Sequence, residues 1–427
     1  MTPDTSIYLH IPFCVHRCAY CDFNTYAGQE SLIPAYVDSL LREINFIGHQ
    51  TTNLPNYQAT KTIFFGGGTP SLLSGPQLAS IMDALRAAFA FSLDLEATIE
   101  ANPGTTSLDF LHQIRAAGIN RLSFGVQSAN PFELHMLERA HDFFDVIQSV
   151  KWARQAGFDN LNLDLIYALP EQTLASWKST LQRIVDLHPE HISAYALTLE
   201  HGTPFGHWSQ RGLLPLPDPD LAADMYEFAE EFLASNGYIH YEISNWAMAV
   251  ESQRSKVAPD LRPSTFDPRP EFACRHNLQY WHSLPYLGLG AGAHGYANGY
   301  RYSNVLRIKT YIERLNTENW SLKTAFPLTP ATVNHHRQTE RDDMGEYMLN
   351  NLRLLIEGVS EADFKSRFGR ELMEVYPKEI TDLIQLGLLE RIPIENSENG
   401  TRNTQSAIRL TPSARLVSNQ VFMRFVD

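Results

Sequence analysis

Along the first half of the chain, short apolar runs alternate with longer segments in which apolar residues recur every three or four positions. The short runs predict buried strands and the longer segments predict amphipathic helices. Strands are expected to begin at Ile7 and to lie at 61–65, 97–101, 121–126, 161–168 and 192–199. Helices are expected between them at 34–47, 76–91 and 108–117, in a longer stretch that ends at 156, and at 174–187. Each spacing allows a right-handed crossover, so the pattern predicts six βα units in a curved parallel sheet or partial TIM-like (β/α)6 barrel.

Polar or glycine-rich groups stand at the carboxyl ends of these predicted strands, where the chemistry of such folds gathers. They are Cys14, Gly66–Thr69, Glu100, Gln127, Asp164, Tyr195 and Thr198. Glu100 and Asp164 sit among apolar residues, where an unpaired carboxylate would be costly. We expect them to accept hydrogen bonds from ribose hydroxyls or a bound amine, or to pair with Arg139; a structural ion pair is the alternative for either residue alone.

The second half of the chain predicts smaller elements. A helix is expected at 221–235 with a solvated Glu230-Glu231 pair, an alternating strand at 238–246, and an exposed polar insertion at 251–271. Gly288–Gly295 matches a dinucleotide-binding spacing, but no helix pattern follows it, so a nicotinamide site is discounted. Its glycines are expected to let the chain pass close to a cofactor.

The last hundred residues become helical. Helices are expected at 341–356, 361–368, 371–386 and 413–425, with short strands near Leu388 and Ala407. Helices followed by a hairpin predict a winged-helix-like accessory domain. The expected division is therefore a barrel at 1–247, the insertion and a following segment packed on the barrel at 248–333, and the accessory domain at 334–427.

Three of the four cysteines, Cys14, Cys18 and Cys21, fall within eight residues after the first predicted strand. Three thiolates on one loop hold three corners of an iron–sulfur cluster and leave one iron open, whereas electron-transfer clusters have four cysteine ligands. The alternative is a structural zinc site completed by His10 or His16.

Composition narrows the classes of function. A net charge of −14 argues against nonspecific nucleic-acid binding, and the 44% hydrophobic and 19% charged residues are those of a globular protein. No apolar run reaches membrane-spanning length and the first residues lack a secretory pattern. We expect a reducing cytoplasmic location, where clustered cysteines are more often metal ligands than disulfides.

The C-x3-C-x2-C spacing, with Tyr20 before the last cysteine, resembles the cluster loop of the radical SAM superfamily. The segments Tyr8–Phe13, Gly66–Pro70, Phe124–Gln127 and Asp164–Pro170 resemble the oxygen-independent coproporphyrinogen III oxidase family over nearly the whole chain. The resemblance implies a [4Fe-4S] cluster whose open iron chelates S-adenosylmethionine.

Two features separate the branches of that family. The dehydrogenases carry a further cysteine where this chain has Phe23, and Cys274–Trp281 resembles the H-N-x-x-Y-W heme motif of the HemW-type heme chaperones. His276 is then the expected heme ligand, with Asn277, Tyr280 and Trp281 against the porphyrin; a core histidine in an aromatic cluster is the alternative. Cys274 is expected to be a buried structural thiol.

Residue by residue, the resemblance implies where the cofactors bind. The residues expected around S-adenosylmethionine and the cluster are Tyr8, Tyr20, Gly67, Gly68, Thr69, Glu100, Gln127, Arg139 and Asp164, with looser contacts near Ala293 or His294. The expected function is a heme chaperone that delivers heme to membrane respiratory enzymes, cytoplasmic or peripheral to the membrane, with a homodimer left open. The alternatives are a radical coproporphyrinogen dehydrogenase and a zinc-stabilised binding protein.

Overall fold

The computed structural model describes residues 5–51, 59–249, 270–317, 325–398 and 401–426. These residues form two compact units, one of Met1–Ala229 with Leu284–Arg337 and one of Glu230–Ser283 with Gln338–Asp427. The boundaries of these two units differ from those of the three expected domains, so the expected division into three domains stays a prediction. The insertion at 251–271 falls almost wholly outside the described residues.

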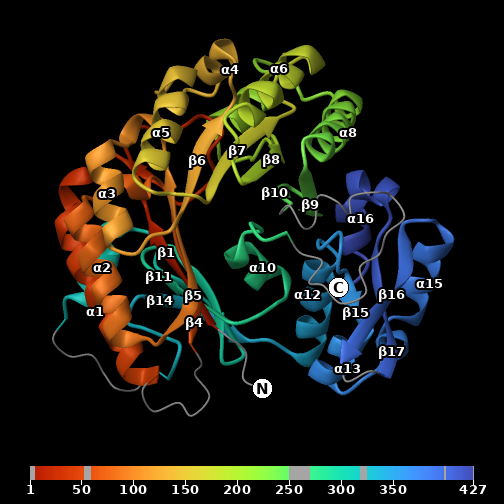
Figure 1. Cartoon of the computed structure of the whole chain (residues 1–427). Helices are drawn as coiled ribbons and strands as arrows, with labels where there is room; N and C mark the ends of the chain where they lie inside the picture. The colour runs from red at the N-terminus through yellow and green to blue at the C-terminus, as the bar shows by residue number, and fades with distance from the viewer. Residues whose placement is uncertain (1–4, 52–58, 250–269, 318–324, 399–400, 427) are drawn as a thin grey trace. The chain divides into compact units, whose positions relative to one another are not determined.

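Six parallel strands build the centre of the first unit (Figure 1). They pair in chain order, and the prediction of a partial (β/α)6 barrel is confirmed. The strands are β1 Thr5–Ile11, β4 Thr60–Gly67, β5 Phe91–Ala101, β6 Arg121–Gln127, β7 Leu161–Tyr167 and β8 His191–Ala196.

Helices connect these strands, and Figure 1 shows α1, α2, α3 and α5 along one face of the sheet. Several begin at the polar residues that satisfy free backbone N–H groups: Ser74, Asp142 and Thr173 each form a capping box. The helices are α1 Ile33–Thr51, α2 Gly75–Ala88, α3 Leu108–Ala116, α4 Pro131–Met136, α5 Phe143–Gln155, α6 Leu174–Val185, α7 Pro204–Gln210 and α8 Pro219–Ser235.

A strand from far along the chain extends the sheet beside β1. β11 (Tyr286–Leu289) runs parallel to β1, with Gly288 opposite Tyr8. β12 (His294–Ala297), β13 (Tyr300–Asn304) and β14 (Thr332–Arg337) then follow antiparallel, with α11 (Ile308–Leu315) between the last two. The glycines at 288–295 therefore serve a close backbone approach: a Cβ on Gly290, whose φ is +98°, would lie 2.5 Å from the His10 carbonyl oxygen.

A buried carboxylate on α1 joins this extension to the barrel. Glu43 is fully buried and accepts four hydrogen bonds of 2.7–2.8 Å, from donors that lie between 247 and 286 residues away. The donors are the Gly290 N–H, Asn304 Nδ2, Tyr311 Oη and Thr329 Oγ1. Burial raises the pKa of Glu43, and these donors oppose the shift.

The second unit begins with a hairpin where one strand was expected. β9 (Tyr238–Glu242) and β10 (Asn245–Met248) pair antiparallel about a turn at Ile243-Ser244. The prediction of a continuous strand over 238–246 is wrong, because Ser and Asn favour the turn conformation that interrupts it. Glu230 is not simply solvated either, since its carboxylate binds His240 Nδ1 at 2.8 Å and Arg415.

The C-terminal part of this unit is a helical cluster closed by a long hairpin. β16 (Leu389–Glu398) and β17 (Thr401–Leu410) pair over their whole length, and β15 (Val359–Ser360) joins β17. The expected helix at 371–386 is interrupted at Tyr376, before Pro377. The helices are α10 Arg275–Trp281, α12 Glu340–Asn351, α13 Glu361–Phe368, α14 Leu372–Val375, α15 Pro377–Gln385 and α16 Ser418–Phe422.

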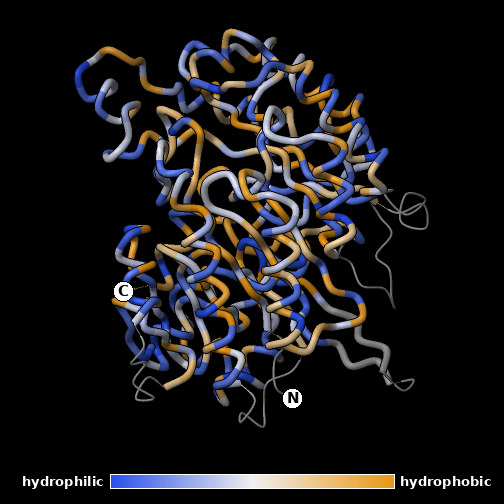
Figure 2. The backbone as a smooth tube through the Cα atoms, turned by 90° about the vertical axis from the view of Figure 1, so that its left-hand side faces the viewer, coloured by the Kyte–Doolittle hydropathy of each residue, from blue (hydrophilic) through white to orange (hydrophobic). Residues whose placement is uncertain are grey.

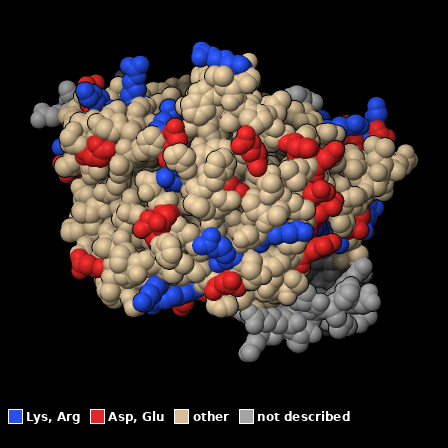
Figure 3. Space-filling model, turned by 90° about the horizontal axis from the view of Figure 1, so that it is seen from above, with Lys and Arg blue, Asp and Glu red and all other residues tan. Residues whose placement is uncertain are grey.

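Hydrophobic and hydrophilic residues alternate within single elements along the trace in Figure 2. Within the described residues, no helix has the length and apolarity needed to span a membrane. Acidic and basic side chains are interspersed over the face seen in Figure 3, as on an ordinary protein surface.

We expect Glu43→Ala to lower the free energy of unfolding by about 3 kcal/mol, because four buried donors lose their acceptor. Urea unfolding followed by tryptophan fluorescence measures this. Asp38→Ala is the matched control, since Asp38 is an exposed carboxylate on the same helix and should change stability by no more than about 0.5 kcal/mol. Equal effects of the two substitutions would contradict the role given to Glu43.

Candidate cofactor and heme sites

The cysteine loop is closed at its base by a pair of short parallel strands. β2 (Phe13–Cys14) pairs with β3 (Tyr26–Ala27), and the Tyr26 N–H donates to the Pro12 carbonyl at 2.8 Å. This pairing brings the chain back on itself, so that all three cysteines lie on one loop at the carboxyl end of β1. Phe23, at the position of the dehydrogenases' extra cysteine, is 64% exposed.

Each thiol of the loop has a polar neighbour. Cys14 Sγ lies 3.6 Å from Thr69 Oγ1, Cys18 Sγ lies 3.5 Å from Arg139 Nη1, and Cys21 Sγ lies 3.9 Å from Thr25 Oγ1. Burial raises the pKa of Cys14 and of Cys21, and the other thiols of the loop raise the pKa of Cys14 further. A bound metal group would favour the thiolate forms of all three cysteines.

His10, the buried histidine of the zinc alternative, has both ring nitrogens hydrogen-bonded. His10 Nε2 lies 2.9 Å from the Asn24 carbonyl oxygen and its Nδ1 lies 2.9 Å from Tyr8 Oη. A carbonyl only accepts, so Nε2 carries the hydrogen and Nδ1 accepts from the tyrosine; burial lowers the pKa of His10 and keeps the ring neutral. His16 Nε2 pairs with Glu138 at 3.0 Å.

The glycine loop after β4 passes directly beneath the cysteine loop. The Gly68 N–H donates to Ile11 O and the Thr69 N–H to Phe13 O, at 2.9 and 2.8 Å. A Cβ on Gly68 would lie 2.6 Å from Phe13 O and 3.1 Å from Cys14 Sγ, and one on Gly67 would lie 2.6 Å from the His10 ring. Gly67 also has φ +111°, which favours glycine. At both positions a Cβ would come too close to its neighbours, so only glycine allows this approach.

Glu100, in β5, holds the same loop from the other side. Its Oε2 accepts from the Gly67 N–H at 3.0 Å. Burial and the neighbouring Asp164 carboxylate raise the pKa of Glu100 to about 8, although the bond from Gly67 opposes the shift. A cationic or hydroxyl-bearing ligand beside Glu100 would therefore bind together with proton release near neutral pH.

Arg139 joins the cysteine loop to the ends of β5 and β6. Its Nη2 donates to Asn102 Oδ1 and to Gly125 O, and Asn102 Nδ2 donates to Thr69 Oγ1 at 3.0 Å. Arg139 thus pairs with neither Glu100 nor Asp164. Its Nε is buried and has no acceptor among the described residues, which fits an anionic ligand group such as a carboxylate.

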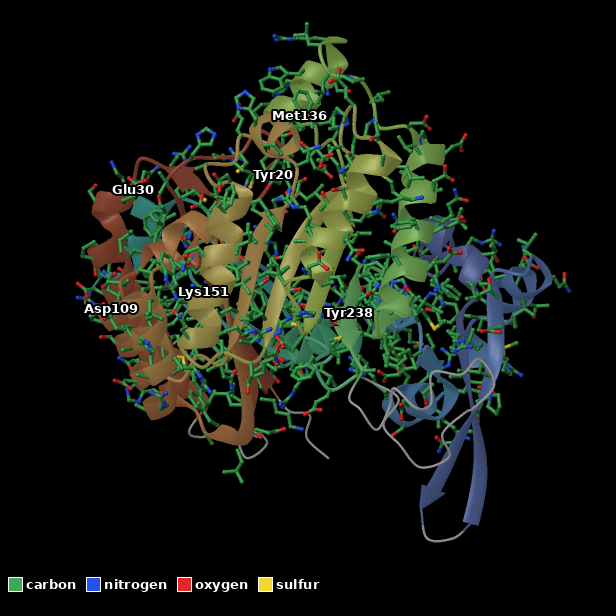
Figure 4. All side chains as sticks on the ribbon, turned by 45° about the horizontal axis from the view of Figure 1, so that its top comes forward. Tyr20, Glu30, Asp109, Met136, Lys151 and Tyr238 are labelled. Atoms are coloured by element: carbon green, nitrogen blue, oxygen red, sulfur yellow. The ribbon has the colours of Figure 1, made fainter. Side chains whose placement is uncertain are left out.

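Gln127 and the two tyrosines complete the rim of this site. Gln127 ends β6 with φ +68°, a left-handed turn at the strand end. Tyr8 stacks on Phe64 with ring centroids 6.3 Å apart, and burial together with Glu100 raises its pKa. Tyr20 and Met136 pack on one apolar cluster, and Figure 4 shows both at the same end of the first unit, with Lys151 and Asp109 on helices away from that end.

Asp164 is bound by side chains that no motif in the sequence singled out. Ser123 Oγ donates to its Oδ2 at 2.7 Å and Asn162 Nδ2 donates to its Oδ1 at 2.8 Å. Asn102 and Tyr36 were also missed, and His10 was expected only as an alternative zinc ligand. Tyr36 Oη donates to His10 O at 2.6 Å and accepts from the Ala291 N–H. The detectable signal was the period-two placement of polar residues inside β6, β7 and β8.

The heme-motif residues lie on α10 in the second unit. His276 is 1% exposed, and its Nε2 lies 2.8 Å from Tyr280 Oη, one helical turn further on. Asn277 and Tyr280 are partly exposed. Cys274, just before the helix, is a buried free thiol whose backbone N–H donates to Tyr241 Oη.

Trp281 is the last residue of α10 and contacts another part of the same unit. The Arg353 guanidinium lies 4.4 Å from the centroid of the Trp281 ring, as in a cation–π contact. Arg353 also lowers the pKa of Glu242, which burial raises more strongly. His276, Tyr280 and Trp281 thus lie on one short helix, and their role at heme stays a prediction.

Comparison with known proteins decides the family. Residues 8–184 match the radical SAM superfamily and residues 338–393 match the HemN C-terminal domain. The heme chaperone HemW of Bacillus subtilis is 37% identical over 424 residues, 99% of each chain. The heme chaperone HemW of Escherichia coli is 38% identical over 294 residues, 69% of this chain and 70% of that protein.

The chain belongs to the HemW family of radical SAM proteins. The expected family and branch are confirmed. Among solved structures, coproporphyrinogen III oxidase from Escherichia coli matches with a TM-score of 0.76 at 24% identity, over 99% of this chain and 90% of that one, which supports the shared fold. HemW membership within the radical SAM superfamily implies a [4Fe-4S] cluster and S-adenosylmethionine rather than zinc.

We expect Glu100→Gln to flatten the pH dependence of stability. In the wild type the carboxyl binds its proton more tightly when folded than when unfolded, so the stability it contributes is present below about pH 4.5 and is lost as the pH rises to about 8. Each unit of pKa difference corresponds to about 1.4 kcal/mol. Thermal unfolding at pH 5 and pH 8.5 should show the variant gaining relative stability only at the higher pH.

We expect replacement of Cys14, Cys18 and Cys21 by Ser to abolish cluster binding. Anaerobic reconstitution of the wild type should give about four iron and four acid-labile sulfide per chain, with broad visible absorption, and the triple variant neither. Cys274→Ser is the matched control, because that thiol belongs to the second unit. Zinc without sulfide in the wild type would contradict the cluster.

Proposed function

We propose that the protein is a heme chaperone. It binds heme at α10, holds a [4Fe-4S] cluster and S-adenosylmethionine at the carboxyl ends of the strands in the first unit, and passes heme to recipient proteins. The observation that carries this proposal is the placement of His276, Asn277, Tyr280 and Trp281 on one helix of a chain whose full-length relatives are named heme chaperones.

His276 is the proposed iron ligand. Its Nε2 now lies against the Tyr280 hydroxyl, and a neutral imidazole nitrogen with an available lone pair is what heme iron requires. Binding would replace that hydroxyl by iron and release Tyr280, whose ring and that of Trp281 supply flat apolar surface for the porphyrin. The Arg353 guanidinium, over the Trp281 ring, would keep the indole in place.

The residues around the cysteine loop fit the implied cofactors. Cys14, Cys18 and Cys21 would hold three irons, and the open iron would bind the amino and carboxylate groups of S-adenosylmethionine. Arg139 and Gly67–Thr69 are proposed to receive the methionyl part, and Glu100, Gln127 and Asp164 the rest; the contacts of Arg139 with Cys18 and of Glu100 with Gly67 support this. Bound there, the cluster supplies electron transfer to S-adenosylmethionine.

The cellular setting belongs to the same proposal. The recipients are proposed to be respiratory enzymes of the membrane, reached by a cytoplasmic protein that associates peripherally with the membrane and forms a homodimer. The coproporphyrinogen dehydrogenase alternative shares the fold, but this chain has Phe23 where the dehydrogenases carry their additional cysteine.

Heme titration of the anaerobically reconstituted protein, followed by Soret absorption, tests the proposal. We expect stoichiometric binding by the wild type and at least about tenfold weaker binding by His276→Ala, because the axial ligand is lost. His282→Ala is the matched control: this histidine follows α10 and pairs with Glu357 at 3.0 Å.

Equal binding by wild type and His276→Ala would contradict the assignment of the ligand. Stoichiometric decarboxylation of coproporphyrinogen by the reconstituted protein would contradict the chaperone function itself.

A further inference from the structure

A hydrogen-bonded cluster of neutral side chains lies inside the first unit, directly behind Asp164. Ser123, Asn162, His191 and Ser193 stand on β6, β7 and β8 and are each at most 4% exposed. In the sheet, Ser123 is opposite Asn162 and Asn162 is opposite His191. Ser123, Asn162 and His191 therefore lie in one row across three strands, two residues before Asp164, and Ser193 stands opposite Asp164 itself.

Asn162 uses its whole hydrogen-bonding capacity within this cluster. Its Nδ2 donates to Asp164 Oδ1 at 2.8 Å and to Ser123 Oγ at 2.7 Å. Its Oδ1 receives His191 Nδ1 at 2.6 Å and Ser193 Oγ at 3.1 Å. Two donated and two accepted bonds leave the amide no second orientation.

The direction of every bond follows from the carboxylate. Asp164 accepts from Ser123 and from the Asn162 NH2 group, so the amide oxygen of Asn162 is turned toward His191. His191 must then carry its hydrogen on Nδ1. Burial, and after it Arg121, place the pKa of His191 well below its ordinary value, so the ring is neutral and a single tautomer is fixed.

Ser123 completes the support of Asp164. Its hydroxyl accepts from Asn162 and donates its one hydrogen to Asp164 Oδ2 at 2.7 Å. Each carboxylate oxygen thus receives one bond from inside the barrel, and each keeps lone-pair capacity toward the carboxyl edge of the sheet. Two neighbouring acceptors with a fixed separation match two neighbouring hydroxyl groups, as in a ribose.

We propose that Ser123 and Asn162 are positioning residues that hold Asp164 in a single orientation, in which its two oxygens accept the two hydroxyl groups of the S-adenosylmethionine ribose. The proposal rests on the proposed S-adenosylmethionine site. It goes beyond it by assigning recognition of the sugar to three side chains acting together rather than to Asp164 alone. His191 and Ser193 act one step further back, by orienting Asn162.

Equilibrium binding to the reconstituted protein tests the proposal with S-adenosylmethionine and its 2′-deoxy and 3′-deoxy analogues. We expect the wild type to bind each deoxy analogue about tenfold more weakly, the loss of one hydrogen bond to a charged acceptor. Ser123→Ala and Asn162→Ala should each weaken binding of S-adenosylmethionine about tenfold. They should also reduce discrimination against at least one deoxy analogue to less than about threefold, as coupling between the side chain and the hydroxyl requires.

Ser149→Ala is the matched control, because Ser149 is an equally buried serine whose hydroxyl donates to Pro103 O at 2.8 Å, away from this cluster. It should leave both affinity and discrimination unchanged. Cluster absorption and melting temperature of each variant establish that it is folded and loaded. If Asn162→Ala does not fold, Ser123→Ala decides, since it removes one hydroxyl group and leaves Asn162 in place.

The outcomes separate the two levels of the argument. Tight S-adenosylmethionine binding with the wild-type discrimination in Ser123→Ala would overturn the positioning role and leave the proposed cofactor site intact. A wild type that binds S-adenosylmethionine but does not discriminate against the deoxy analogues would overturn the recognition of ribose by Asp164. A loaded wild type that binds no S-adenosylmethionine would overturn the cofactor site and this inference together.

Discussion

Buried charge has to be hydrogen-bonded, and this constraint orders the interior of the first unit. A buried carboxylate without partners costs several kcal/mol, so its surroundings must supply donors. Glu43 receives four donors, Asp164 receives two, and Glu100 receives one, the Gly67 N–H. Glu43 thus has the partners of a residue that completes the fold, whereas Asp164 and Glu100 keep acceptor capacity at the strand ends where the cofactor is proposed to bind.

The same constraint governs the cysteine loop. Three cysteine thiolates holding the implied cluster would concentrate negative charge on a short segment, and the buried Arg139 lies beside it. Tyr20 and Cys18 raise the pKa of Arg139 against the effect of burial, so the guanidinium stays charged. Because Arg139 also binds Asn102, and Asn102 binds Thr69, the cation ties the cysteine loop to the glycine loop. The cysteine loop and the glycine loop are therefore connected by hydrogen bonds rather than being two separate motifs.

Local patterns allowed the sequence to predict the six strands, the glycine loop and the cysteine loop, because each depends on neighbours in the chain. Glu43 could not be predicted in its role: it looks like one more charge on an amphipathic helix until Asn304, Tyr311 and Thr329 are brought to it by the fold. The parallel pairing of β11 with β1 was missed for the same reason. The alternation of residues along their strands indicated that Asn162 and His191 face inward. Only the register of the sheet shows that the two side chains meet.

Helix α10 illustrates the opposite case, in which a contact depends only on residues close in the sequence. His276 and Tyr280 are four residues apart, so one helical turn brings them together without help from distant segments, and the motif could be interpreted from sequence alone. The contact they make has a physical consequence for the proposed heme chaperone. A buried imidazole nitrogen left without a partner would be costly, and the Tyr280 hydroxyl removes that cost in the heme-free chain. Under the proposed function, iron would have to compete with this hydroxyl, so the bond that stabilises the heme-free chain would also weaken the hold on heme and favour its transfer.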